Sequence, residues 1–304
     1  MNRSQPRTLI TGDAGFVGQH ALRLLPGSIG LSSHGHGIDI RDTAALTACL
    51  EVLRPERVIH LAAQSFVPES FRDPAATFDV NFTGTLRLLE ALQASGFCGR
   101  LLFVGTGDVY GLVDAADLPL SENRPPRPRN PYAVSKVAAE ALCYQWSQTG
   151  PFEIVMVRPF NHIGAGQSPA FAISDFARQI AEIHHGRRPP QLVTGNIDVS
   201  RDFTDVADVV AAYGLLLEKG KNGEIYNVCS GVERSIRSVV ERLLALSGTA
   251  AEIVTDPARF RPADQPRVCG DPRKLKLATG WAPVTPFDDT LTHLYAYWEK
   301  QIGL

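Results

Sequence analysis

Cysteine is scarce in this sequence, and no two cysteines are placed to bind a metal. Five occur among 304 residues, an odd number, and they are widely spaced: Cys49, Cys98, Cys143, Cys229 and Cys269. Because there is no Cys-x-x-Cys pair, we predict neither a disulfide framework nor a zinc site, and no other cluster suggests a metal. This cysteine usage is typical of a reduced, cytoplasmic protein.

Long hydrophobic runs and an excess of one charge are also missing. No apolar stretch approaches the roughly 18–20 residues that a membrane-spanning helix needs. Residues 1–12 lead directly into a strand-like segment, without the apolar core of a signal peptide. The 30 basic and 32 acidic side chains leave a net charge of −2, which argues against a nucleic-acid or membrane-surface protein. We therefore expect a soluble protein with neither nucleic acid nor membrane as partner.

What the sequence does contain is a regular alternation of two hydrophobic patterns. Short, continuous apolar runs alternate with longer segments of helical period, which is typical of a parallel sheet covered by helices on both faces. The expected strands are 8–12, 57–62, 100–105, 153–159 and 224–231. The expected helices are 16–25, 43–53, 75–92, 132–146 and 205–220. We predict an α/β fold with a doubly wound parallel sheet.

The pattern loosens after Pro159. Loops rich in Gly, Pro and Arg there separate isolated helices, as in the substrate-specific parts of enzymes. The helix and strand near 205–230 are expected to return to the sheet. We predict a nucleotide-binding domain made of 1–160 plus about 205–230, and a smaller, discontinuous C-terminal α/β substrate domain made of 161–204 plus 231–304.

Three regularly spaced glycines follow the first expected strand. The run TGDAGFVG, residues 11–18, places Gly12, Gly15 and Gly18 at the strand-to-helix turn. Gly12 permits a tight turn, Gly15 lets the backbone approach a diphosphate, and Gly18 allows close helix–strand packing. The N–H groups that begin the helix can bind the phosphates. Such glycines also serve ordinary turns, but in this strand–turn–helix context they predict a Rossmann-type dinucleotide site.

The acid that normally ends the second strand of such a fold is missing. It would hold the 2′-hydroxyl of the adenosine ribose, but Ser32, Ser33 and His34 follow the strand expected at 28–31. Asp39 comes later, and it either faces the adenine or provides an acid ahead of the next helix. A site without a carboxylate can accept a 2′-phosphate. We therefore predict NADPH as the cofactor, with NADH as the second option.

Tyr132 and Lys136 form the candidate catalytic pair. In the run PYAVSK they are four residues apart, on one face of a helix. A nearby ammonium lowers the pKa of a phenol, so that the phenol exchanges protons nearer to neutral pH. Thr106 follows an expected strand at the sheet edge where such folds bind ligands, and its hydroxyl can bond a substrate oxygen. A Tyr–Lys pair alone is common on helix surfaces, so the prediction depends on the three residues together with the glycine loop.

Seven motifs in order resemble the extended short-chain dehydrogenase/reductase family, in its branch that modifies nucleotide sugars. They are TGDAGFVG, HLAAQ, VNFTGTLRLLEA, VYG, PYAVSK, RPFNHIGAGQ and RDFTDVADVV, and they run from residue 11 to residue 210. The resemblance implies that Tyr132 is the acid/base, that Lys136 supports it and binds the nicotinamide ribose, and that Thr106 orients the sugar oxygen. The cofactor site would then include Gly12, Gly15, Phe16, Val17, Gly18, Ser33, Asp39, Ile40, Leu61, Ala62, Ala63, Tyr132, Lys136 and Pro159.

Asp108, in the run GTGDVYG, bears on the type of reaction. At the corresponding position, the sequences of the 4,6-dehydratases in this family read Thr-(Asp/Ser)-Glu. Their Glu helps to eliminate water. Asp108 is one methylene shorter and follows Gly107, so its carboxylate would fall short of the position where the dehydratase acid works. Hydride transfer needs only Thr106, Tyr132 and Lys136. Asp108 can equally be a turn residue that accepts backbone N–H groups.

Further resemblances concern the sugar nucleotide. GNIDVSRDF (195–203) and FRPADQ (260–265) resemble segments of the GDP-mannose 4,6-dehydratases, which implies that two arginines hold the diphosphate. QSFVPESF (64–71) resembles their hexose-binding loop. The substrate site implied in this way comprises Ser65, Val67, Glu69, Thr106, Gly107, Asp108, Tyr132, Asn161, Arg201, Arg261 and Asp264.

The runs GDVYG, RNPYAVSK, RPFNHIG and YNVCSG resemble the GDP-sugar reductases of this branch. They imply reduction of the C4 ketone of a GDP-linked 4-keto-6-deoxy-hexose, GDP-4-dehydro-6-deoxy-D-mannose. A 4,6-dehydratase or 4-epimerase on the same scaffold is the alternative. A non-catalytic, cofactor-sensing regulator is more distant, since it would be expected to lose Tyr132 or Lys136. Family members dimerise through the helix that bears Tyr132, so a homodimer is expected.

Overall fold

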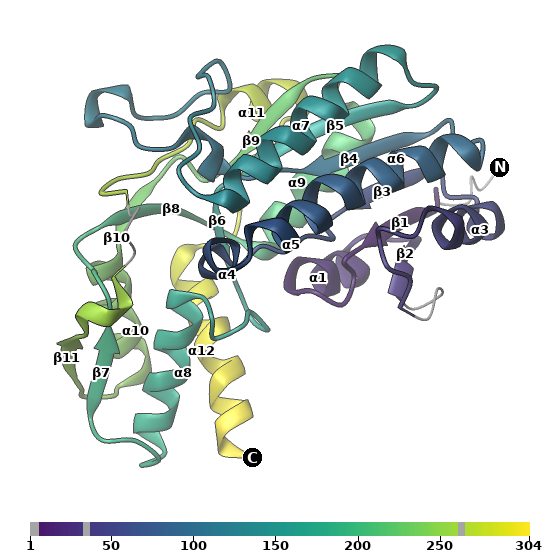
Figure 1. Cartoon of the computed structure of the whole chain (residues 1–304). Coiled ribbons are helices and arrows are strands. Elements are labelled where there is room, and N and C mark those ends of the chain that lie inside the picture. Colours follow the sequence, from purple (N-terminus) through teal and green to yellow (C-terminus); the bar gives the residue numbers. More distant parts are fainter. Residues whose placement is uncertain (1–5, 33–36, 261–264) are drawn as a thin grey trace.

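A computed structural model describes residues 6–32, 37–260 and 265–304 of the chain (Figure 1). Among these residues, six strands form one parallel sheet in the order β2-β1-β3-β4-β5-β9. They are β1 (Thr8–Thr11), β2 (Ser28–Gly30), β3 (Arg57–His60), β4 (Arg100–Val104), β5 (Glu153–Pro159) and β9 (Ile225–Val228). The strand order reverses between β1 and β3, which is where open sheets of this kind bind ligands. The predicted doubly wound parallel sheet is confirmed.

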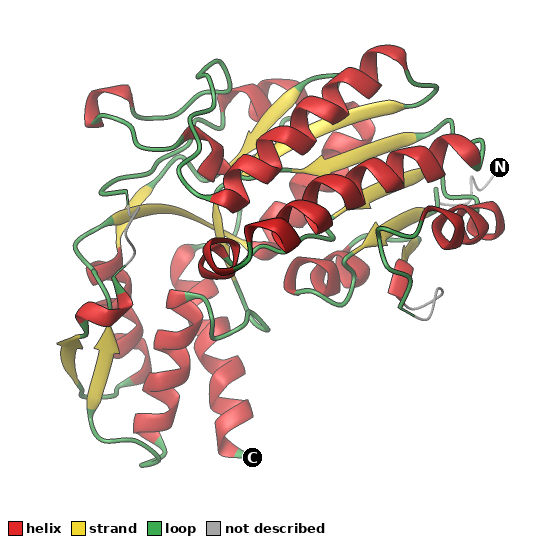
Figure 2. Ribbon diagram, in the orientation of Figure 1, coloured by secondary structure: helices red, strands yellow, loops and turns green. Residues whose placement is uncertain are grey.

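Helices cover both faces of this sheet (Figure 2). One face carries α3 (Thr43–Leu53), α6 (Gly84–Ala94) and α7 (Pro131–Thr149); the other carries α1 (Phe16–Leu24), α9 (Val206–Lys219) and α11 (Arg273–Thr279). The neighbours Leu9 and Ile10 on β1 belong to opposite cores, and both are almost fully buried. Strands buried on both faces read as continuous apolar runs, which explains why the sequence pattern predicted them.

A π-helical turn interrupts the helix that was predicted over 75–92. The chain passes from α5 (Pro74–Phe78) through the π-helix Asp79–Thr83 into α6. Periodicity predicts which side of a helix is buried, but it does not reveal a widened turn within that helix. The turn holds Asn81, which is 1 % exposed. Such turns recur at functional sites, and Asn81 indeed belongs to the site described below.

A smaller α/β part lies below the sheet in the view of Figure 1. Its strands form a three-stranded sheet, β10-β8-β6, and a parallel pair, β11-β7. The strands are β6 (Asn161–Ile163), β7 (Gln191–Thr194), β8 (Ser200–Asp205), β10 (Glu233–Ser235) and β11 (Glu252–Thr255). The main helices are α8 (Ala172–His184), α10 (Ile236–Ser247) and α12 (Phe287–Gly303). A separate apolar core that includes Phe176, Leu192 and Leu291 holds this part together.

The domain boundaries given above stay a prediction, but two packing facts bear on them. β9 pairs with β5 in the large sheet. Leu275 of α11, together with Trp281, packs in the core beneath that sheet, although both residues fall in the range 231–304 that was predicted for the substrate domain.

The short helices of the described residues are α4 (Val67–Arg72) and the 3-10 turns η2 (Gly107–Tyr110), η3 (Ala115–Asp117) and η4 (Pro257–Arg259).

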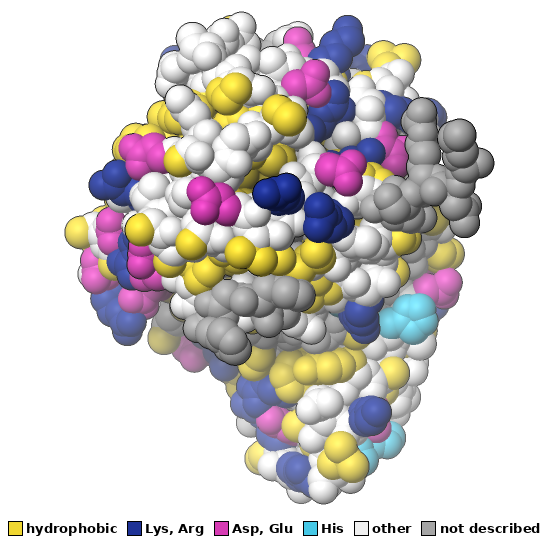
Figure 3. Space-filling view, turned by 90° about the vertical axis from the view of Figure 1, so that its right-hand side faces the viewer, with side chains coloured by type: hydrophobic (Ala, Val, Ile, Leu, Met, Phe, Trp, Pro, Cys, Tyr) yellow, Lys and Arg dark blue, Asp and Glu magenta, His cyan; other side chains and the backbone are white. Residues whose placement is uncertain are grey.

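Within the described parts of the chain, no helix combines the length and the hydropathy that crossing a membrane requires. On the face shown in Figure 3, basic and acidic side chains are interspersed. This distribution agrees with the balanced composition of the sequence.

His60, at the end of β3, is buried and held neutral in the interior. Its Nδ1 accepts from the hydroxyl of Thr11 at 2.8 Å, and its Nε2 donates to Thr85 at 3.0 Å. We assign this tautomer because the Thr85 hydroxyl donates to the carbonyl of Asn81 and must therefore accept from the ring. Burial, followed by the charge of Lys136, lowers the pKa of His60 to about 3.

This histidine is expected to make the protein acid-sensitive. The unfolded chain binds a proton near pH 6.5, whereas the folded chain does so only near pH 3, so stability falls as pH drops through that window. The slope from this residue is about 1.4 kcal/mol per pH unit. We expect His60→Gln to flatten the pH dependence of the unfolding free energy between pH 6.5 and 5. An unchanged slope would mean that His60 is not the group responsible.

Candidate active site

The glycine loop has the geometry that a dinucleotide requires. Gly12 adopts φ +71°, and a Cβ there would lie 2.7 Å from the nitrogen of Ala62. A Cβ on Gly18 would lie 2.3 Å from the carbonyl oxygen of Gly12. A Cβ on Gly15, by contrast, would meet only that oxygen, at 3.1 Å. Gly12 and Gly18 therefore permit close packing of the backbone, whereas the space beside Gly15 is largely open.

The N-terminus of α1 lacks a side-chain cap. Its N-cap residue, Gly15, makes no such hydrogen bond, and no acid lies in the first turn. By comparison, α3, α7 and α9 begin with Asp42, Asn130 and Asp205, each of which accepts a backbone N–H. Uncapped N–H groups at the positive end of a helix are suited to a diphosphate. These residues therefore fit the predicted dinucleotide.

The loop after β3, which holds Leu61, Ala62 and Ala63, lies against the glycine loop; that these three residues line the cofactor stays a prediction. The nitrogen of Leu61 donates to the carbonyl of Thr11 at 3.2 Å, and that of Ala62 donates to the Thr11 hydroxyl at 3.2 Å. Phe16, at the start of α1, stacks on His162 with 6.2 Å between ring centroids. These contacts bring the glycine loop together with segments that are distant in the sequence.

Asn81 joins this loop to the helix that bears Tyr132, a role that sequence analysis did not identify. Its amide oxygen accepts from the nitrogen of Gln64 at 2.8 Å. Its amide nitrogen donates to the carbonyl of Gln64 at 3.0 Å and to the hydroxyl of Ser135 at 2.9 Å. Ser135 precedes Lys136 on α7. The feature of the sequence that could have identified Asn81 is its polar side chain within the otherwise helical, largely apolar run VNFTGT.

Tyr132 lies at the start of α7, beside the end of β4. It is 9 % exposed, and its phenol lies close enough to the Thr106 side chain for that residue to affect its pKa. Burial raises the pKa of Tyr132 and the charge of Asp108 raises it further, whereas the Thr106 side chain lowers it. We predicted that Lys136 lowers the pKa of Tyr132. This is wrong for the protein without its ligands, in which the pKa is raised. A phenol with a raised pKa remains protonated and is suited to donate a proton.

Lys136 follows one turn later on the same helix. Its Nζ donates to the carbonyl of Val104 at 2.8 Å and lies 5.1 Å from the ring centroid of Phe103. It is 3 % exposed, and burial lowers its pKa to about 8. The carbonyl of Val104 and the helix geometry fix the ammonium at the carboxyl end of β4.

Asp108 lies in the 3-10 turn η2 that follows β4. Its backbone nitrogen donates to the hydroxyl of Thr106 at 3.2 Å. The preceding Gly107 leaves room for Phe160, whose ring would lie 3.2 Å from a Cβ there. Thr106, Asp108, Tyr132 and Lys136 thus meet at one edge of the sheet, as the sequence predicted for a catalytic site.

The residues predicted around the adenosine are placed unequally. Asp39 is exposed, and hydrogen bonds from Arg41 lower its pKa to about 2. The cap of α3 is Asp42, which accepts from Ala45, so Asp39 is not the capping acid. Ile40 is buried against Gly84, where a Cβ would lie 2.7 Å away. Ser33 lies outside the described residues.

The other residues predicted to bind the substrate lie on several different elements, and they differ in how exposed they are. Ser65 and Asn161 are exposed, Val67 and Glu69 begin α4, and Pro159 ends β5. Arg201 of β8 donates to the carbonyls of Ser200 and Gln265 at 2.8 and 2.7 Å. Arg261 and Asp264 lie outside the described residues.

The motif RDF contains a structural acid next to Arg201. Asp202 is fully buried and accepts from the backbone nitrogens of Ser230, Gly231 and Gly270 at 2.8, 2.9 and 3.2 Å. These bonds fasten β8 of the smaller part to the loop that leaves β9. Asp202 therefore positions the strand that carries Arg201.

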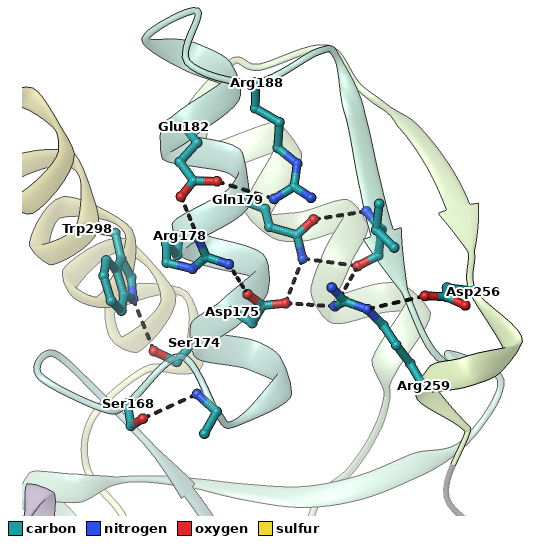
Figure 4. Close-up of polar contacts among 12 residues, drawn as sticks. Ser168, Ser174, Asp175, Arg178, Gln179, Glu182, Arg188, Asp256, Arg259 and Trp298 are labelled. Carbon is teal, nitrogen blue, oxygen red and sulfur yellow. Dashed lines mark hydrogen bonds and ion pairs between the residues drawn. The ribbon is translucent and has the colours of Figure 1, made fainter.

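A polar cluster stabilises the smaller part (Figure 4). Asp175 of α8 accepts from Arg178 and Gln179 at 2.6 Å each, and from Arg259 at 2.9 Å. Gln179 also binds both the N–H and the carbonyl of Val193, at 3.0 Å each. Because Arg259 ends η4, this cluster fixes the turn that immediately precedes the predicted nucleotide-binding residues.

Comparisons with known proteins agree with this site. The family model described as GDP-mannose 4,6 dehydratase matches residues 27–294. GDP-6-deoxy-D-mannose reductase of Pseudomonas aeruginosa is 46 % identical over 299 residues, which cover 97 % of this chain and 98 % of that protein.

Solved structures agree as well. A structure of RMD from Pseudomonas aeruginosa complexed with NADPH superposes with a TM-score of 0.92 at 46 % identity, covering 98 % of this chain and all of that one. UDP-glucose 4-epimerase of Thermus thermophilus in complex with NAD gives a TM-score of 0.83 at 30 % identity, covering 96 % and 98 %. The chain belongs to the GDP-mannose 4,6-dehydratase family, within the extended short-chain dehydrogenase/reductases.

Proposed function

We propose that this protein reduces the C4 ketone of GDP-4-dehydro-6-deoxy-D-mannose to give GDP-6-deoxy-D-mannose, with NADPH as the reductant and NADH as a second option. The observation that carries the proposal is Tyr132, which is buried beside Thr106 and Asp108 at the sheet edge and whose pKa is raised by burial. The similarity to the Pseudomonas reductase supports the choice of sugar.

The chemistry divides between the cofactor and three side chains. When bound, the reduced nicotinamide supplies the hydride that C4 receives. Thr106 orients the ketone oxygen by a hydrogen bond, and Tyr132 donates the proton that this oxygen needs as it becomes a hydroxyl. The ammonium of Lys136 stabilises the negative charge left on Tyr132. Asp202 and the Asp175 cluster position the segments expected to bind the GDP moiety, including Arg201.

A 4,6-dehydratase is the second candidate, because Asp108 lies close enough to Tyr132 to raise its pKa. A dehydratase or an epimerase regenerates its cofactor in each cycle, whereas a reductase consumes one NADPH per turnover. The protein is incubated with GDP-mannose alone, and separately with the 4-keto sugar and NADPH or NADH, while absorbance at 340 nm is followed. We expect stoichiometric NADPH loss with the keto sugar only. Conversion of GDP-mannose without cofactor loss would favour the dehydratase, and no turnover at all would favour a cofactor-binding regulator.

The pKa of Lys136 predicts an alkaline limit to activity. Its lowered value of about 8 means that the ammonium is present below pH 8 and is lost above it. We therefore expect kcat/KM to fall above pH 8, about tenfold per pH unit. The control is Lys136→Arg, whose guanidinium stays charged throughout this range. If kcat/KM of this variant still falls above pH 8, the titrating group is not Lys136.

We also propose a homodimer that uses the outer face of α7. Val134, Ala141 and Tyr144 are exposed there and lie on one side of the helix. A charged, long side chain in the middle of this face should prevent close helix packing. We expect Ala141→Arg to halve the mass in solution to the 33.0 kDa of one chain, while Leu277→Arg on α11 leaves it unchanged. A mass of one chain for the unmodified protein would reject the dimer.

A further inference from the structure

We propose that Tyr110 is a positioning residue for the proton-transfer step, because its hydrogen bond to Asn227 fixes the turn η2 that follows Thr106. This role rests on the proposed function, since it concerns the same reaction. Tyr110 is the last residue of η2, and Thr106 is the N-cap of that turn. Tyr110 is 1 % exposed, and its hydroxyl donates to Oδ1 of Asn227 at 2.7 Å.

The turn η2 is short, and its internal hydrogen bonds are long. The nitrogen of Asp108 donates to the Thr106 hydroxyl, and the nitrogen of Gly111 donates to the carbonyl of Asp108, both at 3.2 Å. Short 3-10 turns have poorer hydrogen-bond geometry than α-helices. Ahead of the turn, Gly105 is still tied to β5 by a bond to the carbonyl of Val157 at 2.8 Å. The positions of Thr106 and Asp108 therefore depend on what anchors the far end of the turn.

Tyr110 anchors that far end to the large sheet. The strand order is β4-β5-β9, so this side chain reaches from the turn after β4 across β5 to Asn227 of β9 (Figure 1). A second bond at this end, from the nitrogen of Arg127 to the carbonyl of Val109 at 2.8 Å, comes from an exposed residue outside the strands. The hydroxyl of Tyr110 is thus the contact that places the turn relative to the sheet.

Asn227 offers this hydroxyl a fixed acceptor. It is fully buried. Its Nδ2 donates to the carbonyl of Leu120 at 2.8 Å, and its backbone nitrogen donates to Oε1 of Glu122 at 2.7 Å. Because Nδ2 faces a carbonyl, Oδ1 is the atom that faces Tyr110, and the tyrosine is the donor. An acceptor held in this way gives the Tyr110 hydroxyl one defined position.

The ring of Tyr110 also meets the side chains that hold the helix of Tyr132. The guanidinium of Arg158 lies 4.9 Å from the ring centroid, and it binds Glu140 of α7 at 2.6 and 2.9 Å. The turn after Thr106 and the helix that bears Tyr132 are therefore fastened to one buried network. This network sets the spacing between the hydroxyl that orients the ketone and the phenol that protonates it.

The test is Tyr110→Phe, which keeps the ring and removes only the hydroxyl. An excess of NADPH-loaded protein is mixed with the 4-keto sugar, and the rate constant and amplitude of the absorbance loss at 340 nm are measured over a single turnover. We expect the rate constant to fall about 10–100-fold, because a small misplacement of reacting groups slows a reaction steeply. The amplitude and the dissociation constant of NADPH should stay unchanged, since Tyr110 acts on the turn after β4 and not on the glycine loop.

Tyr226→Phe is the matched control. Tyr226 of β9 is also 1 % exposed, but its hydroxyl accepts from the nitrogen of Lys221 at 3.2 Å. This variant therefore loses a buried tyrosine hydroxyl from the same sheet, and its rate constant should equal that of the unmodified protein. Asn227→Ala removes the acceptor instead and should slow the turnover at least as much as Tyr110→Phe. Adding Tyr110→Phe to Asn227→Ala should slow it no further, because the two residues form one contact.

A normal rate constant in Tyr110→Phe would overturn the proposal. So would a reduced amplitude at a normal rate constant, which would mean that the hydroxyl only stabilises the fold. Equal slowing in Tyr226→Phe, or losses that multiply in the double variant, would also contradict it. If Tyr110→Phe does not fold, the rate constant of Asn227→Ala, compared with that of Tyr226→Phe, decides in its place. Each of these failures leaves the reductase proposal standing, whereas no NADPH loss in the unmodified protein with the keto sugar would reject both.

Discussion

Replacing Tyr132 by Phe is expected to lower kcat about 10³-fold while NADPH affinity stays nearly unchanged. The phenol is the acid that converts the ketone oxygen to a hydroxyl, and loss of a positioned acid costs about 10²–10⁴-fold in rate. Its ring is buried at the start of α7, and Phe preserves that packing. What the change removes is the hydroxyl that lies near Thr106 and Asp108.

The measurement is the rate of NADPH consumption with the keto sugar, alongside a fluorescence titration of NADPH. The matched control is Tyr295→Phe, which removes a hydroxyl that bonds Glu299 on α12 at 2.5 Å. Its activity should remain near that of the unmodified protein. A Tyr132→Phe variant with more than about a tenth of the normal kcat would show that another group supplies the proton.

Replacing Glu140 by Gln is expected to lower the unfolding free energy by about 3–5 kcal/mol. Glu140 lies on α7, one turn after Lys136, and its two oxygens bind Arg158 of β5 at 2.6 and 2.9 Å. Both side chains are almost fully buried, at 8 % and 3 % exposed. The guanidinium also lies 4.9 Å from the ring centroid of Tyr110. Without the carboxylate, a buried positive charge would be left without its partner.

Denaturant unfolding of the variant measures this loss. The matched control is Glu153→Gln, which breaks the ion pair with Arg100 at the start of β4, where Glu153 is half exposed. That change should cost at most about 1 kcal/mol. The double variant Glu140→Leu/Arg158→Met should be more stable than Glu140→Gln, because it leaves no lone charge. Equal losses for Glu140→Gln and Glu153→Gln would contradict the buried-pair account.

The sequence predicted the parts of the site that follow from spacing along one element. Gly12, Gly15 and Gly18 lie within seven consecutive residues that lead from β1 into α1, and Tyr132 and Lys136 lie one helical turn apart on α7. The strands were recognisable because burial on both faces leaves little choice of side chain. Thr106 could be placed because parallel strands end at a common edge.

Contacts between distant segments were not predictable in this way. Asn81 meets Gln64 and Ser135 only because a π-helical turn brings it into the interior. Asp13 reads as a loop residue, and its hydrogen bond to the backbone nitrogen of Ser32 depends on the space that Gly30 leaves at the end of β2. The raised pKa of Tyr132 depends on burial and on Asp108, and burial is decided by the whole fold.

The most direct test of the reductase account follows the hydrogen that reaches the sugar. The protein is supplied with the 4-keto sugar and NADPH that carries deuterium at the transferable position of the nicotinamide, and the product is examined by NMR and mass spectrometry. The account predicts one deuterium at C4 of the 6-deoxy sugar for each NADPH consumed, with no solvent hydrogen gained at C5 or C6. Label that stays on the cofactor, or solvent hydrogen at C5, would contradict it and indicate elimination or epimerisation instead.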